Sequence, residues 1–317
     1  MFFFLALTAV VSLAHVVGGC LLGCGCVVGL GSVISWKKVC MAVQPIIKWV
    51  GGKRQLLPVI RERVPKGLVW SEATYFEPFV GGGAVLFDLM PDRAVVNDSN
   101  VELINLYRVV EHDVDALIGL LSTYPNDPEF YYEIRALDRD AEVFCNLSDV
   151  ERAARMVYLN KTCFNGLYRV NKKGQFNASF GKYANPKICD EPALRSMSNY
   201  LNSADVEFRC GDYLDALDGA REGDFVYFDP SYAPLSVTSS FARYTSEGFD
   251  LDDQVRLRDV IDELTERGVF VLLSNSSSPV VFDLYSDYET DVVSATRRVN
   301  SKGSGRGAVD EVLIRNF

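Results

Sequence analysis

The tetrapeptide Asp229-Pro230-Ser231-Tyr232 groups a carboxylate, a main-chain carbonyl and an aromatic ring directly after the apolar run Phe225–Phe228. The run predicts a buried strand, so these groups would lie together at its end. The carboxylate and the carbonyl can each accept one N–H of an exocyclic amine on a flat base, and the ring can stack on that base. Two such acceptors would stabilise positive charge as the amine attacks an electrophile. A simple Asp-Pro turn after a strand would use the same residues.

A second candidate site combines a glycine turn with an acid. A predicted strand, Tyr75–Phe79, leads into Gly81-Gly82-Gly83, and a helix would begin at Ala84. The next predicted strand, Ala94–Asp98, ends in a carboxylate. Strand, glycine turn, helix, strand and acid is the plan of an adenosine-cofactor site at the carboxyl edge of a parallel sheet. Asp98 would bind ribose hydroxyls, cap the following helix, or both. The glycines lack the spacing of a dinucleotide site or of a lysine-bearing P-loop, which argues against nucleotide hydrolysis.

The segment Lys48-Trp49-Val50-Gly51-Gly52-Lys53 places two lysines and an aromatic residue around two glycines. In one interpretation Lys53 touches a cofactor carboxylate and Trp49 packs beside it. A plain glycine turn between a strand and a helix is the alternative.

Two stretches of the chain hold basic residues and no acid, although the net charge of the whole chain is −10. The first runs from Arg152 to Cys189 and contains Asn165-Gly166-Leu167-Tyr168-Arg169, and the second carries Arg297, Arg298, Lys302 and Arg306. The acidic total argues against a protein that coats nucleic acid non-specifically, whereas two basic islands favour a focused site for a polyanion. Arg and Asn can read bases, and an aromatic residue can fill the space left by an extruded base. Solvated faces and an Asn-Gly hairpin turn are the alternatives.

The alternation of helices and strands predicts an α/β sheet. We expect residues 41–100 and 199–317 to form this sheet domain. Residues 101–198 would be a smaller helical insertion, with a basic hairpin between Lys161 and Lys187. Predicted helices within it are Val101–Val110, Pro128–Asp138 and Val150–Leu159, and further strands are expected at Val206–Cys210 and Val269–Ser274.

Residues 1–40 form an apolar extension, because no Lys, Arg, Asp or Glu occurs before Lys37. The length would suffice for a membrane span. Alternatively the extension is not normally translated, and the protein begins at Met41. The cysteines lack metal-ligand spacing and the only histidines are His15 and His112, so we expect no metal site. Scattered single cysteines suit a reducing cytoplasm.

Taken together, these segments resemble the Dam-type DNA adenine-N6 methyltransferases of the D12 class over about Gln44 to Asn316. The motifs that carry the resemblance are, in chain order, Lys48–Lys53, Phe76-Glu77-Pro78-Phe79-Val80-Gly81, Asn97-Asp98, Leu159-Asn160-Lys161 with Asn165–Arg169, Asp229–Tyr232, Ala233–Ser236, Phe241 with Tyr244-Thr245, Ser274-Asn275, and Arg297-Arg298 with Asp310–Leu313. The resemblance implies a Rossmann-like methyltransferase sheet with an inserted DNA-recognition domain. It also implies S-adenosylmethionine as methyl donor, no metal, and duplex DNA as partner.

The resemblance also assigns roles to individual residues. Asp229, the Pro230 carbonyl and Tyr232 would act on the flipped adenine. The implied cofactor contacts are Trp49, Lys53, Asp98, Asp229 and, flanking the cofactor adenine, Asp212 and Tyr213. The implied DNA contacts are Leu167 and Arg169 as base readers, Phe164 as a wedge in the duplex, Asn165 at a phosphate or base, and Lys48 and Tyr183.

Two positions depart from the family pattern. Ser231 stands where the family usually has a second proline, which removes a restraint on φ. Ser179 stands where close relatives have a proline that touches DNA. Because Leu167, Arg169 and Asn165 remain, GATC is the expected recognition site. The alternatives are a cytosine-N4 methyltransferase and a sequence-specific DNA-binding protein that has lost transfer. A cognate restriction endonuclease is a conceivable further partner, and a membrane is one only if residues 1–40 are retained.

Overall fold

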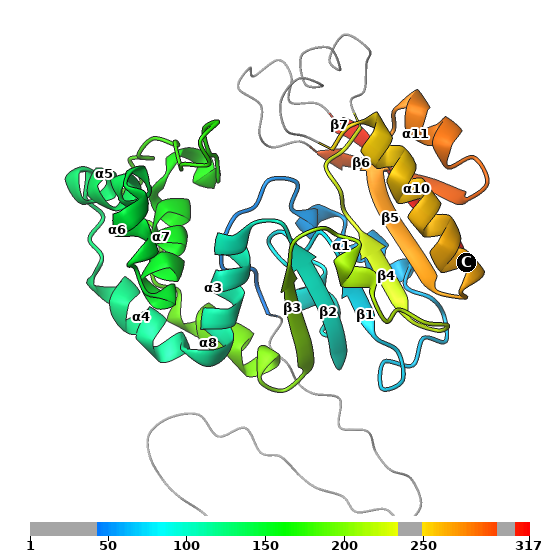
Figure 1. Ribbon diagram of the computed structural model, residues 1–317, viewed down its shortest axis with the longest axis horizontal. Coiled ribbons are helices and arrows are strands. Elements are labelled where there is room, and N and C mark those ends of the chain that lie inside the picture. The colour runs from blue at the N-terminus through cyan, green and yellow to red at the C-terminus, as the bar shows by residue number, and fades with distance from the viewer. Residues whose placement is uncertain (1–42, 234–248, 297–307) are drawn as a thin grey trace, which may run out of the picture. The chain divides into compact units, whose positions relative to one another are not determined.

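The described strands form one sheet, and the side chains along each strand alternate between its two apolar faces. The computed structural model describes residues 43–233, 249–296 and 308–317 (Figure 1). The strands are β1 (Tyr75–Glu77), β2 (Arg93–Asp98), β3 (Asp205–Cys210), β4 (Phe225–Phe228), β5 (Phe270–Ser276), β6 (Glu289–Thr296) and β7 (Ala308–Arg315). Their order in the sheet is β3-β2-β1-β4-β5-β7-β6.

The first five strands of the chain are parallel, whereas β7 runs antiparallel to both of its neighbours, β5 and β6. The chain builds outward from β1 through β2 to β3 and then crosses to β4 on the other side of β1. In such sheets, ligands bind in the crevice outside the carboxyl ends of the two strands where the order reverses. The segments after β1 and β4 are therefore the expected place for a site. The predicted Rossmann-like α/β sheet is confirmed.

Each sheet face is covered by its own set of helices. Tyr75, Phe225 and Tyr227 face one apolar cluster, whereas Val226 and Phe228 face the other. The first cluster includes residues of α1, α2 and α3, and the second includes residues of α10 and α11. The helices are α1 (Leu57–Glu62), α2 (Leu86–Leu89), α3 (Val101–His112), α4 (Val114–Thr123), α5 (Pro128–Ala136), α6 (Ala141–Cys145), α7 (Asp149–Thr162), α8 (Glu191–Leu201), α10 (Leu251–Glu266) and α11 (Pro279–Leu284), with short 3-10 turns η1 (Lys53–Gln55), η2 (Leu137–Arg139), η3 (Phe164–Gly166) and η4 (Asp215–Leu217).

Local capping explains where several helices begin. The Asn100 side chain accepts the N–H groups of Glu102 and Leu103 at the start of α3. Helices α7 and α10 begin with capping boxes, in which the N-cap side chain and the acidic side chain three residues later each accept the other's main-chain N–H. The predicted helices at Val101, Pro128 and Val150 are confirmed to within a few residues at each end.

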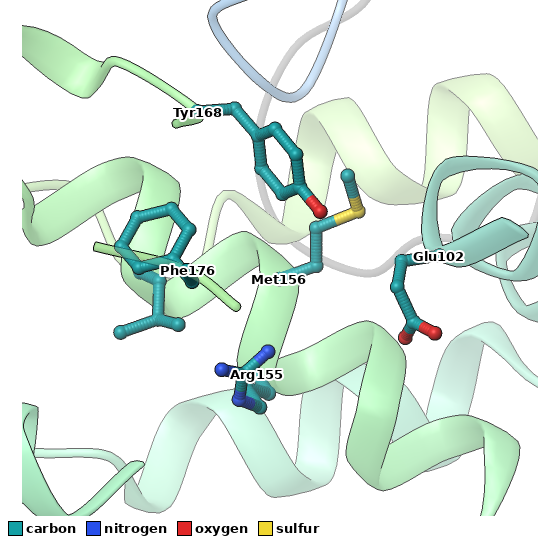
Figure 2. Close-up of a pocket in the computed structure, with 6 residues that line it drawn as sticks. Glu102, Arg155, Met156, Tyr168 and Phe176 are labelled. Atoms are coloured by element: carbon teal, nitrogen blue, oxygen red, sulfur yellow. The ribbon is translucent and has the colours of Figure 1, made fainter. Parts of the chain in front are cut away.

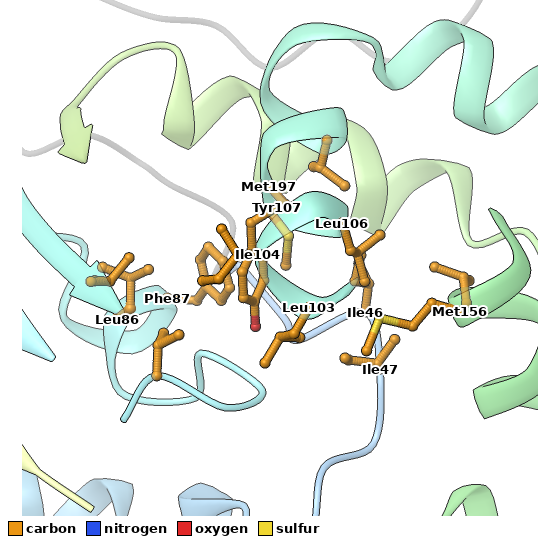
Figure 3. Close-up of a cluster of buried hydrophobic side chains, with 14 of the residues drawn as sticks. Ile46, Ile47, Leu86, Phe87, Leu103, Ile104, Leu106, Tyr107, Met156 and Met197 are labelled. Atoms are coloured by element: carbon orange, nitrogen blue, oxygen red, sulfur yellow. The ribbon is translucent and has the colours of Figure 1, made fainter. Parts of the chain in front are cut away.

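The helices between β2 and β3 share an apolar cluster with the sheet. Figure 3 shows Leu103, Ile104 and Tyr107 of α3 lying between Leu86 and Phe87 on one side and Met156 of α7 on the other. Because one apolar cluster spans these elements, the helices that follow β2 pack against the sheet. Residues 1–40, the motifs at Pro234–Thr245 and the second basic island at 297–306 lie outside the described residues.

Candidate active site

Asp229, directly after β4, forms a buried ion pair with Lys53. Lys53 Nζ lies 2.8 Å from Asp229 Oδ1, and the two side chains are only 5% and 19% exposed. The same ammonium donates to the carbonyl of Gly51 at 2.7 Å and lies 4.7 Å from the centroid of the Tyr232 ring. Burial raises the pKa of Asp229 to about 6, and the charge of Lys53 opposes that rise. Lys53 ends one motif and Asp229 begins another that is distant in the chain, and the two meet at the carboxyl end of β4.

Tyr232 is held at its far end by a residue of the last strand. Its hydroxyl donates to Oε2 of Glu311 on β7 at 2.5 Å. Burial and the carboxylates of Asp229 and Glu311 raise the pKa of this phenol far above its ordinary value. The phenol therefore remains protonated and acts as the donor in this contact.

The glycine turn after β1 lies against Trp49. Gly81 adopts a φ of +47°, and a Cβ there would lie 2.8 Å from Cδ1 of Trp49. Its N–H donates to Oδ2 of Asp98 at 3.1 Å, and its carbonyl accepts from the Tyr107 hydroxyl at 2.6 Å. Only glycine combines that conformation with such close packing, so the turn brings Trp49 and Asp98 to the end of β1.

Asp98 is not the N-cap of α3, because Asn100 fills that position. Asp98 Oδ1 instead accepts the N–H of Asn100 at 2.9 Å. Burial raises the pKa of Asp98, whereas the N–H groups of Asn100 and Gly81 lower it. Its carboxylate thus lies at the end of β2, beside the turn that follows β1.

A cluster of aromatic side chains contains Phe79, which follows β1, and Tyr213, which follows β3. The rings of Phe79 and Tyr213 are 5.1 Å apart, and Phe249 packs edge-on against Phe79 at 5.7 Å. Asp212 pairs with Arg256, whose guanidinium lies 5.2 Å from the Tyr213 ring. Among the described residues, nothing hydrogen-bonds the buried Tyr213 hydroxyl. Flat apolar rings, an unpaired hydroxyl and the Asp98 carboxylate match the chemistry of an adenosyl group.

Except for Lys48, which lies in the 48–53 loop, the predicted DNA-contact residues lie on an irregular hairpin after α7, at residues 163–183. Isolated bridges pair Cys163 with Phe180 and Val170 with Phe176. Phe164 is 59% exposed at its start, and Asn165 adopts a φ of +60°. The other predicted contacts in this segment are a half-buried Leu167 and an exposed Arg169. Arg169 Nε donates to Oδ1 of Asn177 at 2.6 Å within the same hairpin.

A buried amide joins this hairpin to the 48–53 loop. Asn160, 1% exposed, accepts the N–H of Lys48 at 2.8 Å and donates to the Lys48 carbonyl at 2.8 Å and the Gly166 carbonyl at 3.2 Å. Trp49 stacks on Tyr168 with ring centroids 5.1 Å apart, and Lys48 Nζ lies 5.7 Å from the centroid of the Tyr183 ring. The sequence matched Asn160 to the family pattern, yet gave no sign of this linking role.

The first basic island is only partly available to a polyanion. Arg152 is paired with Glu102, and Arg155 is buried and lies 2.7 Å from Asp138. These two arginines are engaged in ion pairs within the protein, so neither the focused polyanion site nor the solvated face expected for this island would include them as free charges. Lys172 and Lys173 are exposed at the hairpin tip.

The cavity in Figure 2 lies under the hairpin and has a volume of about 10 Å³. Tyr168 and Phe176 of the hairpin, Glu102 of α3 and Arg155 and Met156 of α7 line it. Such a volume has room for about one water molecule, so the cavity is a packing gap and not a ligand site.

In the part of the chain that the structure describes, no three His, Cys, Asp or Glu side chains are grouped to hold a metal ion. No helix among those residues is long and apolar enough to span a membrane.

Comparisons with known proteins agree with this geometry. The family model described as D12 class N6 adenine-specific DNA methyltransferase matches residues 49–299. The type II methyltransferase M1.LlaDCHI of Lactococcus lactis is 48% identical over 277 residues, which cover 87% of this chain and 96% of the relative. The type II methyltransferase M.MjaIII of Methanocaldococcus jannaschii is 42% identical over 293 residues, 87% of this chain and 100% of the relative. The DNA adenine methylase of Escherichia coli is 34% identical over 272 residues, 84% of this chain and 93% of the relative.

Proposed function

We propose that this chain, which belongs to the D12 class of N6 adenine-specific DNA methyltransferases, methylates the adenine of GATC in duplex DNA. The observation that carries the proposal is the set of groups around the Lys53 ammonium: the Asp229 carboxylate, the Gly51 carbonyl and the Tyr232 ring. Here the oxygens of Asp229 and Gly51 accept the N–H groups of the Lys53 ammonium beside the face of the Tyr232 ring. The amino group of an extruded adenine would require the same kinds of partner.

The chain's own residues would prepare that amine for attack. The Asp229 carboxylate and the Pro230 carbonyl would each hold one amino hydrogen and stabilise the growing positive charge. Tyr232 would stack on the base. Lys53 favours the ionised form of Asp229, because its positive charge lowers the pKa that burial raises. When bound, S-adenosylmethionine supplies a methyl group on a positively charged sulfur, and alignment of the two reactants would provide much of the rate.

The residues present fit that co-substrate. We assign its adenine to the aromatic group at Phe79 and Tyr213, with Asp212 beside it, and its ribose hydroxyls to Asp98. Trp49 and Lys53 would line the remainder of the site. The clustering of these side chains at the ends of β1, β2 and β4 supports the assignment.

The hairpin would read the recognition site. Arg169 and Leu167 would contact bases, Phe164 would enter the space left by the extruded adenine, and Asn165 would contact a phosphate or base. Lys48 and Tyr183 would add DNA contacts beside them. The similarity to a relative named DNA adenine methylase and the retention of these residues support GATC.

The test incubates the protein with labelled S-adenosylmethionine and unmethylated duplexes carrying GATC or the matched palindrome GTAC. Digestion to nucleosides then identifies the product. Label in N6-methyladenine from the GATC duplex alone is expected. Equal labelling of both duplexes would refute the site preference, and label in cytosine or no label would refute the activity. The family match does not favour the cytosine-N4 alternative.

We also propose a cognate restriction endonuclease as a partner, because two of the relatives are named type II methyltransferases. DNA modified by this chain should then resist an endonuclease encoded in the same genome. Cleavage of modified and unmodified DNA at equal rates by every such endonuclease would contradict the pairing.

A further inference from the structure

The main chain just beyond Tyr232 is fixed by two buried side chains. Asn275 Oδ1 accepts the N–H of Ala233 at 3.2 Å, and Ser276 Oγ donates to the Ala233 carbonyl at 2.7 Å. Asn275 and Ser276 end strand β5 and are 0% and 2% exposed. Both main-chain polar groups of Ala233 are therefore held by a rigid part of the sheet.

The main chain just before Tyr232 is fixed as well. Gln254 of α10, 1% exposed, donates from Nε2 to the Ser231 carbonyl at 3.3 Å. Its own Oε1 accepts from Nδ2 of Asn275 at 2.9 Å, so the two amides form one connected network. Ser231 has no ring to restrain its φ, and this network holds the segment instead.

With its main chain held on both sides, Tyr232 retains freedom only in its side-chain torsions. The contact at the far end of the ring is the 2.5 Å hydrogen bond to Glu311. A hydrogen bond from a hydroxyl to a carboxylate is shorter than one between neutral groups and roughly twice as strong. Stacking on a base requires the ring and not the hydroxyl, so the hydroxyl serves to set where the ring lies.

We infer that Glu311 is a positioning residue that holds the Tyr232 ring in the orientation on which an extruded adenine stacks. The inference rests on the proposed function and assigns a role to Glu311 of β7 and not to its neighbour Asp310. Strand pairing fixes the place of Glu311, because its neighbours in register are Ser276 on β5 and Val293 on β6. Ser276 also belongs to the network that holds Ala233, so the paired strands β5 and β7 support both the backbone and the ring.

The test is a double-mutant cycle on methyl transfer to adenine in unmethylated plasmid DNA at saturating S-adenosylmethionine. Glu311→Ala and Tyr232→Phe should each lower kcat about tenfold, the effect of losing one charge-assisted hydrogen bond. KM for DNA should change little. Glu311→Gln retains an acceptor and should recover most of the rate. In the Tyr232→Phe background, Glu311→Ala should have no further effect.

Asp310→Ala is the matched control. Asp310 is the preceding residue on β7, is exposed, and accepts from Ser294 Oγ at 2.7 Å. Its loss removes one carboxylate from the same strand and should leave kcat unchanged.

The inference is wrong if Glu311→Ala lowers kcat by the same factor in the Tyr232→Phe background as in the wild type. It is also wrong if Glu311→Gln is as slow as Glu311→Ala. If Glu311→Ala fails to fold, Glu311→Gln must still be faster than Tyr232→Phe, and the reverse order refutes it. Failure of the wild-type protein to label adenine in any DNA would instead refute the proposed function.

Discussion

The proposed catalytic site around Lys53, Asp229 and Tyr232 and the proposed recognition hairpin hold their side chains in different ways. Lys53, Asp229 and Tyr232 are partnered by residues from distant parts of the chain, and little of Lys53 or Asp229 is exposed. Among the described residues, Asn177 of the same hairpin is the one hydrogen-bond partner of the Arg169 side chain, and Phe164 is 59% exposed. Chemistry needs groups that are already in place, whereas readout needs side chains that can meet a partner. Changes in the proposed catalytic site should therefore alter the rate of methyl transfer, and changes in the hairpin should alter the affinity for DNA and the site preference.

The largest effect is expected from Asp229→Asn. The variant keeps the shape of the side chain but loses the negative charge that stabilises the amine, and transfer should fall by roughly 10²–10³-fold. Single-turnover labelling of duplex DNA measures the rate, and thermal unfolding verifies the fold. A rate within a factor of about two of wild type would remove Asp229 from the catalytic role and with it the contrast between the two regions.

Asn160→Ala tests the connection between the regions. The substitution leaves the Lys48 N–H and the carbonyls of Lys48 and Gly166 without their partner, because all three bond to this amide. The free energy of unfolding should fall by about 2–3 kcal/mol, measured by urea denaturation. An unchanged unfolding free energy would mean that the loop and the hairpin are held together by other contacts.

Arg169→Ala should change recognition without changing chemistry. Discrimination at one base pair should relax by about 1–3 kcal/mol, measured as kcat/KM over duplexes substituted at each position of the site. At saturating DNA, kcat should remain that of the wild type. Lys172→Ala is the control. An exposed lysine at the hairpin tip can contact phosphate but carries no base readout, so its loss should weaken binding to all duplexes alike and reduce the salt slope by about 1. Unaltered site preference in Arg169→Ala would place the readout elsewhere.

The smallest expected effect concerns pH. Burial raises the pKa of Asp229 to about 6, so the carboxylate is charged above that pH and gains a proton as pH falls through it. The protonated form accepts the amine poorly, and kcat/KM should fall about fivefold from pH 6 to pH 5 while remaining nearly flat above pH 7. A profile flat down to pH 5 would show that the charge on Asp229 does not limit the reaction.

The sequence predicts those features that are encoded locally. The apolar run before Asp229, the glycine turn and the acid after β2 each follow from a few consecutive residues, and the structure has them where they were expected. The pairings Lys53 with Asp229 and Tyr232 with Glu311 depend on the strand order, which no local pattern contains. The count of basic residues could not show that Arg152 and Arg155 are paired within the protein, since their partners Glu102 and Asp138 lie elsewhere in the chain.

The 48–53 loop touches both regions, through Lys48 and Trp49 at one end and Lys53 at the other. A chimera that exchanges residues 163–183 for those of a relative with another target sequence would place a foreign surface under Trp49. We expect such a chimera to keep its turnover only if the 48–53 loop is exchanged together with the hairpin. If the hairpin reads the target sequence as proposed, we expect a new target sequence to require changes in both segments together.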